Sequence, residues 1–329
     1  MARYAGGADP TSAREFEGVP NKNDFKRPSA LGPGSRVALV APAGPLAADR
    51  VELSVQRCEN MGFEPIVYPS ARQSSGYLAG SDDERLGDLQ RAFDDSSLSA
   101  VWALRGGYGS TRILKRVDLN GMIAHPKAFI GFSDNTALHA ILFEAGLVSF
   151  HGPHPGGAFP PETELLFRRV LSSTVAAGVL PKRPDDPRPV CLHGGRAEAP
   201  LFGGNLALLA ALCGTRPRLS ARGTILFIED VGEPAYKVDR LLIQLRDSGV
   251  LEGVAGLALG RFSEVAVEED TLVQRIFTEL AQELRVPALF DLPIGHIDHN
   301  WTVPLGVRAR IDADQGTLEL MEPAVQEAT

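Results

Sequence analysis

The stretch that decides the fold is Lys127-Ala-Phe-Ile-Gly-Phe-Ser133-Asp-Asn-Thr-Ala-Leu-His-Ala-Ile-Leu142. It predicts a short buried strand, a turn from Gly131 to Asp134, and an apolar-periodic helix of about three turns. A serine at such a junction projects from the end of a sheet, and the helix N-terminus places free N–H groups and positive dipole beside it. Ser133 is therefore a candidate nucleophile, although Asn135 stands where a Gly-x-Ser-x-Gly turn has its second glycine.

A simpler alternative is that Ser133 or Asp134 only caps the helix, which is the usual role of these residue types. Two further segments bear on the choice. The segment from Thr224 to Glu229 is an apolar strand that runs into an acid, and the segment from Pro287 to His296 runs from apolar residues into a Gly-His pair. Ligands bind at the carboxyl edge of parallel strands. A Ser, a Glu and a His at that edge would supply nucleophile, orienting acid and base.

Strands and helices alternate along the chain, which predicts parallel βαβ units. Expected strands lie at 35–42, 64–68, 100–104, 224–228 and 254–259, with helices at 46–61, 82–93, 238–248 and 270–283 and one from about Thr111. A length of 329 residues exceeds one ordinary core and predicts two domains.

We therefore expect an α/β protein in four parts. Residues 1–32 are expected to form a mobile leader, and 33–175 an N-terminal parallel-sheet domain that carries Ser133. The Pro-, Arg- and Asp-rich segment 176–199 is expected to be a linker, although it could be only a long surface loop. Residues 200–329 are expected to form a smaller C-terminal α/β domain, with the active site in the cleft between the domains.

The composition is that of a soluble globular protein, with 44% hydrophobic and 22% charged residues. The net charge of −8 argues against nucleic acids and anionic membranes as partners. No apolar run approaches membrane-spanning length, and the first thirty or so residues lack the apolar core of a signal peptide. The three widely spaced cysteines form no Cys-x-x-Cys pair and suggest a reducing compartment. We therefore expect a cytoplasmic enzyme.

The glycine-rich turn Arg105-Gly-Gly-Tyr-Gly109 follows an expected strand and could bind phosphate. It lacks the Gly-Lys-Ser/Thr of a Walker loop, and Arg112 occupies the last glycine position of Gly-x-Gly-x-x-Gly. The better interpretation is that the glycines bring backbone N–H groups close to a substrate carbonyl.

Eight fragments, in order, resemble the LD-carboxypeptidase family of serine peptidases, which includes muramoyl-tetrapeptide carboxypeptidases and microcin C immunity peptidases. The fragments lie at 37–44, 105–109, 131–134, 151–153, 203–206, 227–230, 260–262 and 295–296. By this resemblance, which covers roughly residues 33–325, Ser133 is the nucleophile, Glu229 the orienting carboxylate and His296 the general base.

The resemblance also implies that the glycine turn and the amide of Asp134 form an oxyanion hole. We expect Gly107 to supply the other donor, with Gly106 nearly as good. Arg105 is a candidate for binding a terminal carboxylate, or it could be a structural ion-pair partner.

Other acids and histidines compete with these assignments. Asp230 and Glu233 compete with Glu229, but strand alternation puts Asp230 on the opposite face. The histidines that compete with His296 are His151, His154 and His299. The pairs His151/His154 and His296/His299 are spaced i, i+3 in expected loops, which is an unspecific pattern for zinc. The serine mechanism requires neither a metal nor an organic cofactor.

The resemblance implies hydrolysis of the bond between an L-centre and a terminal D-amino acid, as in D-alanine release from a cytoplasmic murein tetrapeptide. The expected partners are a small peptide substrate and a second copy in a homodimer. One alternative is microcin-immunity-type hydrolysis of peptidyl- or aminoacyl-nucleotides, which needs an aromatic-rich loop. The segment Pro155 to Pro161 contains only Phe159, which favours the murein peptide. Another alternative is a noncatalytic α/β module that binds a small ligand.

Overall fold

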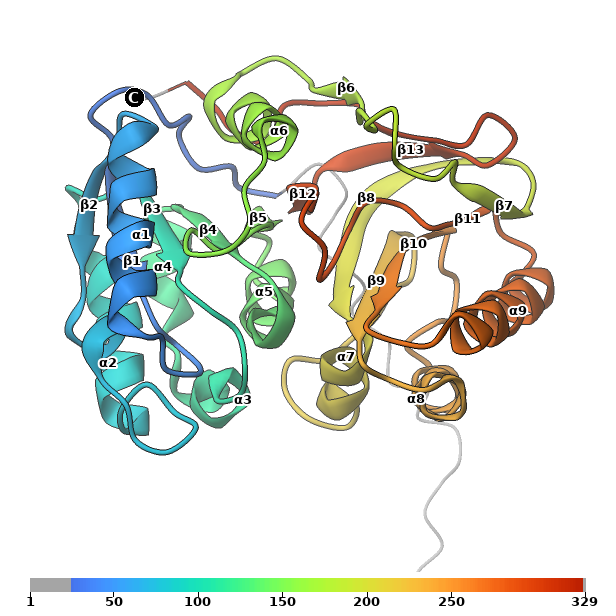
Figure 1. Ribbon diagram of the computed structural model, residues 1–329, viewed down its shortest axis with the longest axis horizontal. Coiled ribbons are helices and arrows are strands. Elements are labelled where there is room, and N and C mark those ends of the chain that lie inside the picture. Colours follow the sequence, from blue (N-terminus) through green and yellow to red (C-terminus); the bar gives the residue numbers. More distant parts are fainter. Residues whose placement is uncertain (1–24, 328–329) are drawn as a thin grey trace, which may run out of the picture.

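The computed structural model describes residues 25–327 and contains two sheets (Figure 1). The N-terminal sheet has six strands in the order β12-β5-β4-β3-β1-β2. Strands β1 to β5 pair in parallel, whereas β12 comes from the far end of the chain and pairs antiparallel with β5. The strands are β1 (Arg36–Val40), β2 (Glu64–Val67), β3 (Ala100–Ala103), β4 (Ala128–Gly131), β5 (Ser149–His151) and β12 (Val303–Leu305).

Helices cover both faces of this sheet, because both faces of its central strands are apolar. Val37 and Leu39 of β1 join a core cluster with α1 and α6, whereas Ala38 and Val40 join a second cluster with α2 and α5. The helices are α1 (Ala48–Asn60), α2 (Asp82–Asp94), α3 (Ser110–Ile113), α4 (Leu119–Ala124), α5 (Thr136–Glu144) and α6 (Pro161–Ser172), with 3₁₀ turns η1 (Pro69–Arg72), η2 (Leu114–Arg116) and η3 (Ser133–Asn135).

The C-terminal sheet has eight strands in the order β6-β14-β13-β8-β9-β10-β11-β7. Its central strands β8 to β11 are parallel, and the outer strands are antiparallel. The strands are β6 (Gly178–Val179), β7 (Val190–His193), β8 (Arg196–Asn205), β9 (Ile225–Val231), β10 (Gly256–Ser263), β11 (Ala288–Phe290), β13 (Arg308–Asp312) and β14 (Thr317–Leu320), and the helices are α7 (Leu206–Leu212), α8 (Ala235–Asp247) and α9 (Val267–Leu284).

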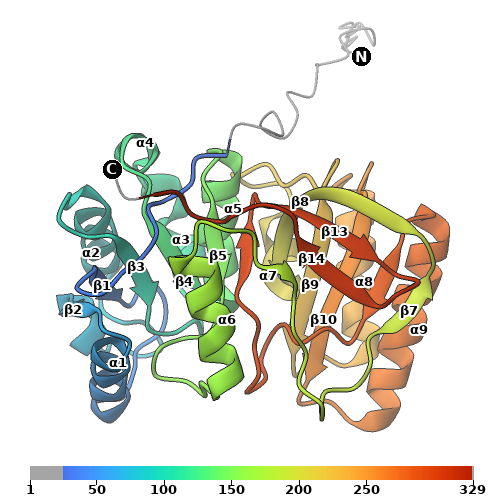
Figure 2. The same cartoon turned by 90° about the horizontal axis from the view of Figure 1, so that it is seen from above.

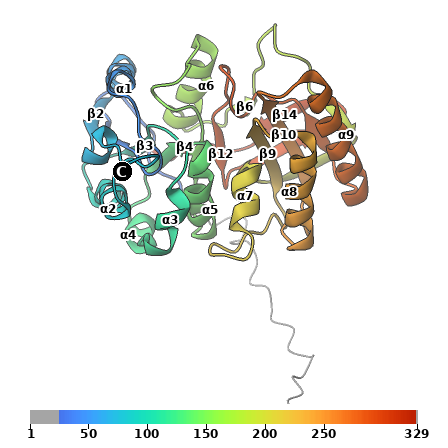
Figure 3. The same cartoon turned by 60° about the horizontal axis from the view of Figure 1, so that its bottom comes forward.

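The two halves meet directly (Figure 2). Strand β12 carries the C-terminal part of the chain into the N-terminal sheet. On one side of the sheets, α5, α7, α8 and α9 follow one another in a row (Figure 3). The N–H of Asn205, at the end of β8, donates to Thr136 Oγ1 at 3.0 Å. This contact sets the C-terminal half against the first residue of the helix that follows Ser133.

The segment 176–199, expected to be a linker, contributes strands to the C-terminal sheet. It contains β6, β7 and the beginning of β8. Its prolines and charged residues obscured the pattern because β6 and β7 are short edge strands, where such residues are tolerated.

Most of the expected leader, residues 1–24, lies outside the described residues. Residues 25–32 are packed rather than mobile. Phe25 and Leu31 are buried, and the Phe25 ring lies 4.8 Å from that of Phe143 between centroids. The N–H of Lys26 donates to the carbonyl of Gly146. Two apolar side chains and a backbone bridge therefore fix this part of the leader.

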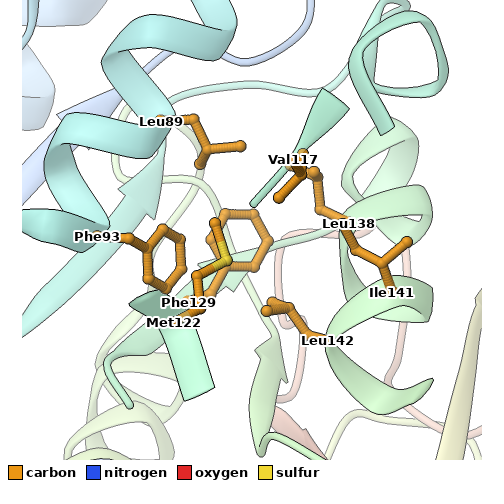
Figure 4. A pocket seen from close by; sticks show the side chains of 8 residues that line it. All are labelled: Leu89, Phe93, Val117, Met122, Phe129, Leu138, Ile141 and Leu142. Atoms are coloured by element: carbon orange, nitrogen blue, oxygen red, sulfur yellow. The ribbon is translucent and has the colours of Figure 1, made fainter. Parts of the chain in front are cut away.

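A small apolar cavity of about 10 Å³ lies between α2, α5 and β4 (Figure 4). That volume suits one water molecule at most, and the lining offers no polar side chain. It is a packing gap and cannot hold a substrate. The lining residues are Leu89, Phe93, Val117, Met122, Phe129, Leu138, Ile141 and Leu142.

Within residues 25–327, no helix combines the length and apolar character needed to cross a membrane.

Candidate active site

Ser133 sits in a strained turn at the end of β4. Phe132 is extended, with φ −152°, and Ser133 then adopts the left-handed conformation at φ 62°. A non-glycine residue there costs about 1–3 kcal/mol, and such strain is concentrated at functional sites. The helix-cap alternative fails, because neither η3 nor α5 has a side-chain cap. The carboxylate of Asp134 instead accepts the N–H of Ser110 at 2.8 Å, at the start of α3.

The glycine turn lies directly against Ser133. A Cβ at Gly106 would lie 2.7 Å from Ser133 Cβ and 3.0 Å from the Asp134 nitrogen, so only glycine fits there. The Gly106 carbonyl accepts the N–H of Gly44 at 3.0 Å. In a trans peptide the C=O and N–H point in opposite directions, so the N–H of Gly107 points away from Gly44. Gly106 thus makes the close approach, and within residues 25–327 the Gly107 N–H has no acceptor in the protein.

Asn135 ties the nucleophile turn to the glycine turn. Its Nδ2 donates to the carbonyl of Phe132 at 3.0 Å and to the carbonyl of Arg105 at 3.2 Å. The sequence pattern marks Asn135 only as the residue in place of a glycine. Asparagine at a turn often bonds nearby backbone groups, so its residue type alone could have indicated this role.

Glu229 and His296 come together although 67 residues separate them in the chain. Glu229 Oε2 lies 2.7 Å from His296 Nδ1. Glu229 is fully buried, whereas the His296 side chain is 20% exposed. A carboxylate on Nδ1 fixes the tautomer with the proton on that nitrogen and leaves Nε2 free to accept a proton. The pair therefore has the arrangement of an orienting acid and a base.

The competing acids are engaged elsewhere. Asp230 accepts from Asn205 Nδ2 and from the Ala207 N–H, both at 2.9 Å, and so helps to start α7. Burial, and then the charge of Glu229, raise the pKa of Asp230 to about 6. Glu233 forms an ion pair with Lys237 at 3.2 Å.

Among the competing histidines, His299 pairs with Asp186 at 2.8 Å. Burial lowers the pKa of His151 well below its ordinary value and lowers that of His154 to about 3, in both cases helped by the nearby His296. These two rings are therefore neutral near pH 7. Among residues 25–327, no group of three His, Cys, Asp or Glu side chains is arranged to hold a metal ion.

Phe132 connects the serine to the His-Glu pair. Its ring centroid lies 4.8 Å from that of His296 and 4.2 Å from that of His154. Within the described part of the chain, Ser133 Oγ makes no hydrogen bond, to His296 or to any other group. Catalytic hydrogen bonds are often long in ligand-free enzymes and tighten in the substrate complex. Arg105 is exposed, and its Nη1 donates to the carbonyl of Pro45 at 2.8 Å.

Comparison with known families gives two consecutive matches. Residues 37–152 match the LD-carboxypeptidase N-terminal domain, and residues 198–311 match the LD-carboxypeptidase C-terminal domain. The chain belongs to the LD-carboxypeptidase family. The expected family and the two-domain α/β fold are thereby confirmed.

Individual proteins that are similar to this LD-carboxypeptidase are consistent with the family match. The murein tetrapeptide carboxypeptidase of Pseudomonas aeruginosa is 36% identical over 85% of this chain and 94% of its own. The muramoyltetrapeptide carboxypeptidase structure from Oxalobacter formigenes superposes with a TM-score of 0.73 at 30% identity, over 87% of this chain and 98% of that one. An MccF-like protein of Bacillus anthracis strain Ames superposes with a TM-score of 0.81 at 26% identity, over 90% and 99%.

The LD-carboxypeptidase site also has a defined electrostatic balance. Burial tends to lower the pKa of His296, but the hydrogen bond and charge of Glu229, with smaller help from Asp230 and Glu264, outweigh it and raise the pKa. The imidazolium form is thus stabilised where a base would have to carry a proton. The family match and the carboxypeptidase relatives support a hydrolase that acts on small peptides.

Proposed function

We propose that this protein is a serine LD-carboxypeptidase that releases a terminal D-amino acid from a murein tetrapeptide in the cytoplasm, as part of cell-wall recycling. The observation that carries the proposal is the contact of His296 with the buried Glu229 at 2.7 Å. His296 packs against Phe132, and the next residue is Ser133, held at φ 62°. The P. aeruginosa relative, named as a murein tetrapeptide carboxypeptidase, supports the substrate class.

In the proposed reaction, His296 Nε2 takes the proton from Ser133 Oγ as the oxygen attacks the scissile carbonyl carbon. The N–H groups of Gly107 and Asp134 hold the resulting oxyanion. Collapse breaks the C–N bond, and His296 gives its proton to the leaving amine. Water, deprotonated by His296, then adds to the acyl-enzyme and regenerates Ser133.

Arg105 is proposed to bind the terminal carboxylate of the substrate. It directly precedes the glycine turn, and its exposed guanidinium has donors left after bonding Pro45. A charge-assisted bond to a carboxylate is worth about 1.5–3 kcal/mol once substrate covers it. The bond would therefore favour substrates with a free terminal carboxylate over substrates whose C-terminus is an amide.

We keep hydrolysis of peptidyl- or aminoacyl-nucleotides as a second candidate, because the similar proteins include an MccF-like structure and the microcin C7 self-immunity protein MccF of Escherichia coli, at 26% identity each. A nucleotide base requires an accessible aromatic face. In the 155–161 segment, Phe159 packs against Trp102 and Phe167, with ring centroids at 6.0 and 5.5 Å. This ring is partly buried against the core, and the Arg57 guanidinium lies 4.9 Å from its centroid, which disfavours stacking on a base and favours the peptide substrate.

A substrate panel tests the proposal. We expect release of D-Ala from L-Ala-γ-D-Glu-meso-diaminopimelate-D-Ala, release at least about 100-fold slower from the L-Ala isomer, and release at least about tenfold slower from the D-Ala amide. The physical reasons are the fit of the D-methyl group and the pairing of the terminal carboxylate. The measurement is amino-acid release from the three peptides at equal concentration.

Three results would contradict the proposed substrate. Comparable rates for all three peptides would exclude a carboxypeptidase of this specificity. Cleavage of an aminoacyl sulfamoyl nucleoside together with inert tetrapeptides would favour the second candidate, and no cleavage at all would favour a noncatalytic ligand-binding protein.

The pH dependence should report His296. We expect kcat/KM to rise with pH through a transition above the ordinary histidine pKa of 6.5, because protonated His296 cannot accept the Ser133 proton and Glu229 raises its pKa. Glu229→Gln removes that charge, so the transition in its residual activity should move to lower pH. The measurement is a pair of pH–rate profiles, and identical transition pH values would exclude His296 as the titrating base.

A further inference from the structure

The glycine turn 105–109 has no regular secondary structure, so contacts from outside must fix its position. The Gly106 carbonyl accepts from Gly44, in the loop after β1. At the other end, Ser110 N–H donates to the Asp134 carboxylate at 2.8 Å. The Arg105 carbonyl accepts from Asn135 Nδ2 at 3.2 Å. The Gly109 carbonyl accepts the N–H of Arg112 at 3.1 Å, but this local bond does not tie the end of the turn to the loop after β1.

Arg85 ties Gly109 to the loop after β1. It projects from the first turns of α2 and is fully buried. Its Nη1 donates to the carbonyl of Gly109 at 3.0 Å and also to the carbonyl of Pro42. One nitrogen therefore joins the loop after β1 to the far end of the glycine turn, and Gly44 and Gly106 join the same two segments a few residues away.

The guanidinium is itself held on its other side. Arg85 Nη2 pairs with Asp82, the first residue of α2. Asp82 also accepts two hydrogen bonds from Arg112, at 2.8 Å from Nε and 2.9 Å from Nη2. The α2 start is fixed by a capping box in which Ser81 and Glu84 bond each other's backbone N–H groups. The Arg85 guanidinium that contacts the glycine turn is therefore held at a well-fixed helix end.

Stabilisation of the fold does not by itself explain why an arginine is buried at position 85. Burying a guanidinium costs free energy, and well-packed apolar residues often stabilise a core more than a buried ion pair does. The arrangement is also tight, because a Cβ at Gly109 would lie 2.8 Å from Arg85 Nη1. The rigid fork of Arg holds two acceptors in a fixed geometry, which a flexible ammonium cannot reproduce.

We propose that Arg85 is a positioning residue for catalysis: by holding the carbonyls of Pro42 and Gly109 it fixes Gly106 against Ser133 and aims the Gly107 N–H at the oxyanion. This inference rests on the proposed serine mechanism. A displacement of about 1 Å in such a group can cost about 100-fold in rate. We expect loss of Arg85 to lower kcat rather than to raise KM, because the oxyanion donor acts on the transition state.

The test compares Arg85→Met and Arg85→Lys with the matched control Arg112→Met. Arg112 binds the same Asp82, but its side chain is 43% exposed and contacts neither carbonyl. We expect Arg85→Met to lower kcat about 100-fold with KM changed less than about threefold. Arg85→Lys should recover about tenfold of that loss, since an ammonium keeps the charge and a donor but lacks the planar geometry of the guanidinium. Arg112→Met should keep kcat within about twofold.

Hydrogen–deuterium exchange of the peptide that spans residues 104–110 gives a second readout without substrate. Exchange should accelerate in Arg85→Met but not in Arg112→Met. Unchanged exchange overturns the tether, and faster exchange with wild-type kcat overturns its role in catalysis. If Arg85→Met does not fold, Arg85→Lys takes its place. Wild-type kcat and wild-type exchange in Arg85→Lys would overturn both the tether and its role in catalysis. An inactive wild type refutes the proposed function, whereas the exchange comparison still decides the tether.

Discussion

Ser133→Ala is expected to abolish release of D-Ala from the tetrapeptide while the protein stays folded. The variant removes the only proposed nucleophile, so kcat should fall by at least about 10⁴-fold. Removing one hydroxyl from a half-buried position opens no large cavity, so the unfolding temperature should change little. The measurement is amino-acid release together with thermal unfolding of the purified variant.

Ser133→Gly is the matched control for the strain at φ 62°. Glycine adopts the left-handed region without the cost of about 1–2 kcal/mol that a side chain incurs there. Ser133→Gly should therefore be at least as stable as Ser133→Ala and equally inactive. Tetrapeptide hydrolysis above a trace in either variant would remove Ser133 from the nucleophile role.

Glu229→Gln is expected to give the second largest loss, a fall in kcat of about 10³–10⁴-fold. The amide keeps the shape of the carboxylate, so the variant should fold. It loses the negative charge 2.7 Å from His296 Nδ1 that stabilises the imidazolium, and its NH₂ group can select the wrong tautomer. The measurement is kcat at a pH well above the wild-type transition, where His296 is neutral in both proteins.

Glu233→Gln is the control for that loss, because Glu233 is the nearby acid paired with Lys237 rather than with a histidine. Its kcat should stay within about twofold of the wild type. If Glu229→Gln retained wild-type kcat, the orienting role would have to pass to another acid. A large loss of kcat in both variants would show that the total negative charge near the site matters, and not the specific bond from Glu229 to His296.

Local sequence predicted the elements that surround the nucleophile. Apolar runs bounded by glycine gave the parallel strands, and the 127–142 segment gave the strand, the turn and the helix that carry Ser133. These predictions succeed because side-chain periodicity and turn chemistry act over a few residues. The same reasoning missed β6 and β7 and the packing of residues 25–32, whose burial depends on distant partners such as Phe143.

The sequence by itself determined the α/β class, the family and the candidates Ser133, Glu229 and His296, because motif order and local pattern are properties of the chain. Only the tertiary structure decided which side chains meet. It joined Glu229 to His296 across 67 residues, and it placed Gly106 directly against Ser133. It also brought Arg85 to two backbone carbonyls, a contact that no sequence pattern indicates. Hydrogen bonds and burial depend on distances in space, and those distances arise only when the strands pair and the helices pack over them.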